Sequence, residues 1–172
     1  MELPIRDGWI VQDNNLFACS RKHIEAVFEM LRRQKERIKF SGGLDPRFLK
    51  KWHVELLKTI RIDEAWISCD EPRMLKWVER AADLLSFLPE KRRRCHVLIG
   101  WNGESMEQAE ERLVKVFDAG FLPFAQLYQG IFGKDLWSLE WKRFQRKWDR
   151  PAAYKAHESA RSCDTEKEYA NT

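Results

Sequence analysis

The chain has 172 residues, of which 44% are hydrophobic and 34% charged, and this composition predicts one globular domain with its own core. Basic residues exceed acidic ones only slightly, so the net charge of +4 permits a polyanionic partner without requiring one. The apolar runs, such as residues 97–100, are too short to span a membrane. The first seven residues lack the pattern of a secretory signal, and we therefore expect a cytoplasmic protein.

Segments that resemble β-strands begin near residues 9, 39, 64, 95 and 123, and an amphipathic helix is predicted after each of the first four. Ser20 caps the first of these helices, and the dipeptide Asp45-Pro46 is expected to open the second. The same combination of an acidic cap and a proline at residues 70–72 opens the third. The fourth helix begins at a capping box formed by Ser105 and Gln108 and ends at Gly120.

The strands recur every 25 to 31 residues, which predicts right-handed crossovers and a parallel sheet. A closed barrel of eight strand–helix units needs ~250 residues, or ~31 per unit. The spacing therefore fits barrel geometry, although five units cannot close a barrel. We expect an α/β fold: an incomplete parallel (β/α) barrel of about five units plus a C-terminal helix over residues 1–150, with a polar, flexible tail at 151–172. An open doubly wound sheet is the alternative.

The four cysteines are isolated from one another in the sequence. Cys19, Cys69, Cys95 and Cys163 stand 50, 26 and 68 positions apart. No pair has the short spacing with which one loop binds zinc or an iron–sulfur cluster. Cys69 and Cys95 lie in apolar segments, where a thiol is most often a small buried hydrophobic group.

The loops that follow the strands carry the residues best suited to bind a ligand, because the carboxyl ends of parallel strands meet at one edge of a sheet. They offer carboxylates, amides and glycines, but neither a phosphate-binding loop nor a dinucleotide fingerprint. Taken singly, Asp45, Asp70 and Ser105 are better explained as helix caps and the glycines as turn residues, and only their joint position at one edge favours a binding role for the set. His96 lies within a predicted strand and is interpreted as a core histidine.

The order of these motifs resembles the later part of radical S-adenosylmethionine proteins, in particular the iron–sulfur oxidoreductase-like members found in phages and prophages. The resemblance covers roughly residues 9 to 150. It rests on residues 11–16 (Val-Gln-Asp-Asn-Asn-Leu), 40–45 (Phe-Ser-Gly-Gly-Leu-Asp), 94–100 (Arg-Cys-His-Val-Leu-Ile-Gly) with Glu104, the Ala109-Glu110-x-Arg112 helix, and residues 120–125.

That resemblance implies a partial parallel (β/α) barrel that binds S-adenosylmethionine and a [4Fe-4S] cluster. By position it implies that Asp13, Asn14 and Asn15 approach the ribose or methionine part of the ligand. Gly43, Asp45 and Asp70 would lie near the ligand at two further strand ends. Gly100 would lie beside the adenine.

The family's Cys-x3-Cys-x2-Cys loop is absent from this sequence, so we expect the chain alone to lack the family's reaction. Three explanations remain open: a truncated gene model, a split protein completed by another polypeptide, and a decayed prophage remnant. The predicted strand at residues 8–12 would form an open sheet edge, which suits a missing N-terminal half, a partner chain or self-association. The substrate is not indicated.

A nucleic-acid-binding module is the alternative function, because residues 137–148 interleave aromatic and basic side chains. However, Trp137, Trp141, Phe144 and Trp148 recur at intervals of 4, 3 and 4, which is the spacing of a buried helical stripe. We therefore expect these rings to pack against the core.

Overall fold

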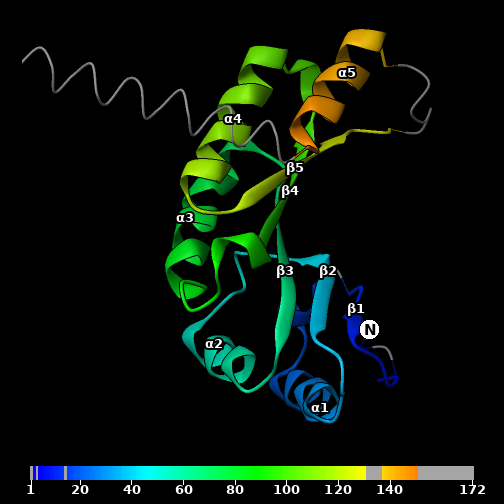
Figure 1. Ribbon diagram of the computed structural model, residues 1–172, viewed down its shortest axis with the longest axis vertical. Helices are drawn as coiled ribbons and strands as arrows, with labels where there is room; N and C mark the ends of the chain where they lie inside the picture. Colours follow the sequence, from blue (N-terminus) through cyan, green and yellow to red (C-terminus); the bar gives the residue numbers. More distant parts are fainter. Residues whose placement is uncertain (1, 3, 14, 131–136, 151–172) are drawn as a thin grey trace, which may run out of the picture.

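The part of the chain that the structure describes forms one all-parallel sheet of five strands (Figure 1). The computed structural model describes residues 2, 4–13, 15–130 and 137–150. The strands are β1 (Ile10–Val11), β2 (Ile38–Leu44), β3 (Ile62–Cys69), β4 (Arg93–Ile99) and β5 (Leu122–Leu127), and their spatial order follows their order in the sequence. The α/β class and all five predicted strands are confirmed. The first and last strands are not neighbours, so the sheet is open.

A helix follows each strand. The α-helices are α1 (Arg21–Arg32), α2 (Lys51–Lys58), α3 (Leu75–Leu84), α4 (Met106–Asp118) and α5 (Leu139–Trp148), and short 3-10 turns are η1 (Leu16–Ala18), η2 (Pro72–Met74), η3 (Glu90–Arg92) and η4 (Trp101–Gly103). None of the helices in the described part of the chain is long and apolar enough to cross a membrane. The tail predicted at residues 151–172, with Cys163, lies outside the described residues.

The two faces of the sheet differ in burial. Along β4 and most of β3, fully buried residues alternate with half-buried ones, and the buried set packs in the core with the helices. Cys69 and Cys95 belong to this buried set, as their apolar surroundings predicted. Sequential parallel strands joined by right-handed crossovers place their helices on the same face. The half-buried side chains therefore project from the opposite face, which we call the open face.

Local sequence determines several helix ends as predicted. Ser20 accepts a hydrogen bond from the His23 N–H at the start of α1, and Ser105 and Gln108 form the capping box of α4. Gly120 follows α4 with a φ of 85°, the left-handed conformation that favours glycine.

The predicted helix start at Asp45-Pro46 is wrong, and the one at Pro72 is right without its predicted acidic cap. Asp45-Pro46 begins a turn, because the Asp45 carbonyl accepts from the Phe48 N–H, and α2 begins only at Lys51. Pro72 does open a helical turn, but no carboxylate caps η2 or α3. Both aspartates are thus left without a capping role.

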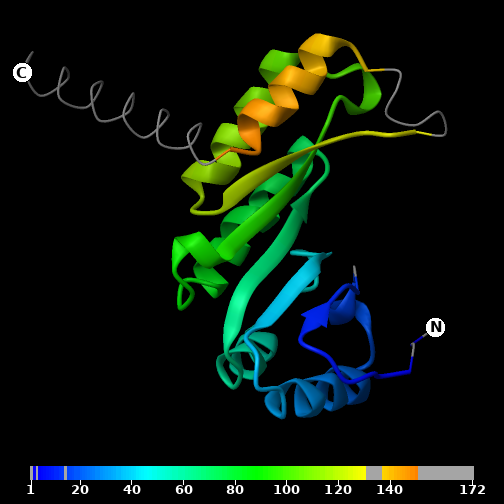
Figure 2. The same cartoon turned by 45° about the vertical axis from the view of Figure 1, so that its right-hand side comes forward.

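Helix α5 covers the outer edge of β5, and Figure 2 shows it lying alongside β5 and α4. Trp148 is buried, and Trp137, Trp141 and Phe144 pack against the core, which confirms the predicted stripe. These rings are therefore engaged in packing. Two side chains from the end of α5 also bind the backbone of Ala125: Gln145 Nε2 donates to its carbonyl at 3.1 Å, and the Asp149 carboxylate accepts a hydrogen bond from its N–H. The helix thereby occupies backbone groups that an added strand would need.

The carboxyl group of Asp149, at the end of α5, makes the stability of the fold depend on pH. Burial raises the pKa of the Asp149 carboxyl to about 6, and the hydrogen bond with Ala125 offsets part of the rise. Between about pH 4 and pH 6 the folded state retains a proton that the unfolded chain has released, so stability decreases as pH rises through this range.

We predict that Asp149→Asn stabilises the protein at pH 7 by about 1–2 kcal/mol, because the amide keeps an acceptor for Ala125 without a buried charge. Urea unfolding at pH 7 and pH 4 measures this gain, which should disappear at the lower pH. Asp83→Asn, an exposed substitution near the end of α3, is the control. A gain that is equal at both pH values would contradict the prediction.

Candidate functional site

A polar cavity of about 620 Å³ lies at the carboxyl ends of the strands. All five strands or the loops directly after them contribute to it: its lining residues are Gln12, Ser41, Gly42, Gly43, Asp45, Ser68, Asp70, His96 and Gln126. A volume of this size accommodates a small organic ligand. We call it the first cavity.

The glycine pair at the end of β2 brings two chain segments close together. A Cβ atom on Gly42 would lie 2.5 Å from the carbonyl carbon and oxygen of Gln12, so the loop after β1 can approach only a glycine. Gly43 has a φ of 87°, which disfavours any side chain there. The end of β2 therefore presents its backbone to the cavity.

Asp45 is held in one orientation by Arg47. The Arg47 guanidinium donates to both carboxylate oxygens, with Nη2 2.6 Å from Oδ2 and Nε 2.9 Å from Oδ1, and the Arg47 backbone N–H also donates to Oδ1. Asp45 itself is only 8% exposed. A bidentate pair of this kind fixes the carboxylate more strongly than a single surface contact would.

Asp70 is the second carboxylate of the cavity and has a different environment. Although Asp70 is exposed as a whole residue, desolvation of its carboxyl, followed by the negative charge of Asp45, raises the pKa of this group, while His96 and Arg47 offset part of the rise. Within the described residues, no hydrogen bond or ion pair reaches this carboxylate. A cationic group in the cavity would therefore stabilise its ionised form.

His96 belongs to an aromatic layer on the open face. Its ring stacks on Trp66 with centroids 4.3 Å apart, and Phe124 meets both rings edge to face. Burial lowers the pKa of His96, against the effects of a hydrogen bond with the Ser41 backbone and of the Asp70 charge. Nδ1 of His96 and Oγ of Ser41 are buried and have no partner among the described residues. Although predicted to be a core histidine, His96 thus lines the cavity as well.

The structure brings together only some of the residues that the sequence singled out. Gly43, Asp45 and Asp70 line the first cavity. Asp13 and Asn15 lie in the loop after β1, where the Asp13 carboxylate accepts from the Asn15 N–H at 2.8 Å, and neither lines the cavity. Asn14 lies outside the described residues.

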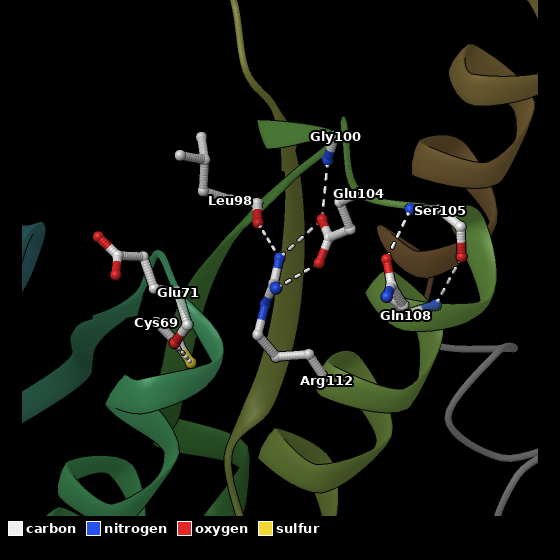
Figure 3. A network of polar contacts seen from close by, with 8 residues as sticks. All are labelled: Cys69, Glu71, Leu98, Gly100, Glu104, Ser105, Gln108 and Arg112. Carbon is white, nitrogen blue, oxygen red and sulfur yellow. Dashed lines mark hydrogen bonds and ion pairs between the residues drawn. The ribbon is translucent and has the colours of Figure 1, made fainter. Parts of the chain in front are cut away.

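Gly100 has a packing role outside the first cavity. Its φ is 75°, and a Cβ atom there would lie 2.3 Å from the Trp137 ring. Its N–H donates to Glu104 Oε2 at 2.9 Å, and Glu104 forms a buried ion pair with Arg112, which also donates to the Leu98 carbonyl (Figure 3). This network fixes the loop between β4 and α4.

The described residues contain no group of three or more His, Cys, Asp or Glu side chains that could hold a metal ion. Cys69 and Cys95 are fully buried, and burial raises the pKa of the Cys69 thiol to about 12 and that of Cys95 well above its ordinary value. These two thiols are therefore packing groups rather than ligands. In comparisons with protein-family models, curated proteins and solved structures, no match to this chain was found.

We predict that Arg112→Met destabilises the protein by about 3–5 kcal/mol, because Glu104 is then buried without its cation. The double variant Glu104→Gln/Arg112→Met should recover part of the loss, and urea unfolding of the four proteins of the cycle measures both effects. Lys115→Met is the control, since its Glu111 partner is exposed and such pairs contribute about 0–1 kcal/mol. Equal losses for Arg112→Met and Lys115→Met would show that the buried pair does not hold the loop.

Proposed function

We propose that this chain is a segment of a (β/α) barrel of the radical S-adenosylmethionine type and that its first cavity binds S-adenosylmethionine. The observation that carries the proposal is the convergence of Gly43, Asp45 and Asp70, from two strand ends, on one polar cavity. The sequential order of the parallel strands supports the barrel relationship, because successive units of a (β/α) barrel pair in that order.

The lining of the first cavity suits the chemistry of this ligand. S-adenosylmethionine has a positively charged sulfonium and ammonium, and Asp70, which has no ion pair among the described residues, supplies negative charge, whereas the charge of Asp45 is balanced by Arg47. Ribose hydroxyls need donors and acceptors, which Gln12, Ser41 and Gln126 can offer. When bound, the ligand supplies an activated carbon–sulfur bond, and the residues named here would bind and orient it.

The residues described do not offer a ligand set for an iron–sulfur cluster, since the thiols of β3 and β4 are buried in the core. The proposed role of this part of the chain is to bind the nucleoside ligand.

Calorimetric titration with S-adenosylmethionine and S-adenosylhomocysteine tests the proposal. We expect saturable binding of S-adenosylmethionine and about five- to tenfold weaker binding of S-adenosylhomocysteine, which lacks the sulfonium charge. Ser68→Leu should abolish both, because the larger side chain fills the cavity, whereas the exposed Ser86→Leu should bind as the unmodified protein does. Absence of saturable binding, or equal binding by Ser68→Leu, would overturn the proposal.

A further inference from the structure

A second cavity of about 570 Å³ lies between the loops that follow β3 and β4. One wall comes from η2 and the start of α3, with Pro72 and Leu75, and the other comes from η4 and α4, with Trp101 and Gln108. Asp70 lines this cavity as well as the first one. The two cavities therefore share one carboxylate.

Trp101 gives the second cavity an accessible aromatic surface. The residue is 43% exposed, unlike the tryptophans on α5, which pack against the core. Its ring meets Tyr128 edge to face with centroids 4.4 Å apart, so one side of the indole is supported by the protein. Together with Pro72 and Leu75, Trp101 offers a flat, apolar ligand a place to pack.

The charges of this cavity favour a cation. Three of its carboxylates already have basic partners: Glu104 pairs with Arg112, Glu111 pairs with Lys115 at 2.6 Å, and Glu71 pairs with Arg73 at 2.5 Å. Asp70 is the exception, since no ion pair or hydrogen bond within the described residues neutralises it. An anionic ligand would meet repulsion from Asp70, whereas an ammonium group would meet a carboxylate available to pair.

Arg112 also lines the second cavity, but its positive charge does not cancel the preference for a cation. Arg112 is 4% exposed, and its guanidinium is engaged by both Glu104 oxygens and by the Leu98 carbonyl (Figure 3). Its positive charge is thus balanced within the protein, and its Nε is buried without a partner among the described residues. The carboxylate that remains unpaired in the cavity is that of Asp70.

We propose that the second cavity binds an organic ammonium ion with a planar apolar body, with the ammonium on Asp70 and the body against Trp101. The aromatic surface of Trp101 adds attraction for the cation itself, since indole is the best of the side-chain rings for this contact. This cavity differs from the one proposed for S-adenosylmethionine, although both ligands would use the Asp70 carboxylate.

Titration with 2-phenylethylamine, followed by NMR of protein with labelled tryptophan indoles, tests the proposal. Trp101→Phe identifies the Trp101 resonance, which should shift with saturation as the amine is added. We expect binding of 2-phenylethanol, which has the same body without the charge, to be at least tenfold weaker. 3-Phenylpropionate, which carries the opposite charge, should not bind.

Two matched variants test the role of Asp70. Asp70→Asn should weaken 2-phenylethylamine about tenfold, whereas Glu71→Gln removes a neighbouring carboxylate that already pairs with Arg73 and should change the affinity less than twofold. Ser68→Leu, which fills the first cavity, should leave amine binding unchanged and so separates the two proposals. Equal affinity for the amine and the alcohol, no effect of Asp70→Asn, or an unshifted Trp101 resonance would overturn the proposal.

Discussion

The parallel pairing of the five strands determines where every other feature of this molecule can lie. Because all strands run in one direction, their carboxyl ends meet at one edge of the sheet, and the chain must cross back over a single face to begin the next strand. That face is sealed by the helices and holds the core. The opposite face carries the aromatic layer of Trp66, His96 and Phe124, polar groups gather at the carboxyl edge, and both cavities lie at that edge.

Within this arrangement, the two aspartates of the first cavity differ because of their neighbours. Arg47 fixes and neutralises Asp45, while Asp70 lies close enough to feel the Asp45 charge but has no ion pair of its own among the described residues. The Arg112–Glu104 pair keeps the loop between β4 and α4 in place without contributing net charge. The carboxyl edge therefore combines a rigid frame with the Asp70 carboxylate, which has no ion pair among the described residues and faces both cavities.

The sequence predicted the strands and most helix ends well because their determinants are local. Ser105 and Gln108 form a capping box through contacts only three residues apart, and the apolar stripe of α5 repeats at the helical period. The prediction that Asp45 and Asp70 cap helices is wrong because the roles of these two carboxylates depend on contacts that are distant in the sequence. A carboxylate followed by a proline looks the same in sequence whether it caps a helix or points into a cavity, and long-range contacts decide between these roles.

Composition and periodicity by themselves determined the α/β class, the five strands and the gathering of Gly43, Asp45 and Asp70 at one edge. The tertiary structure decided which half of each alternating strand is covered, because period-two alternation defines two faces without saying which one the helices pack on. For that reason Ser68, His96 and Gln126 could not be recognised as cavity residues from sequence. Asp70 likewise joins two cavities only because the loops after β3 and β4 are folded side by side.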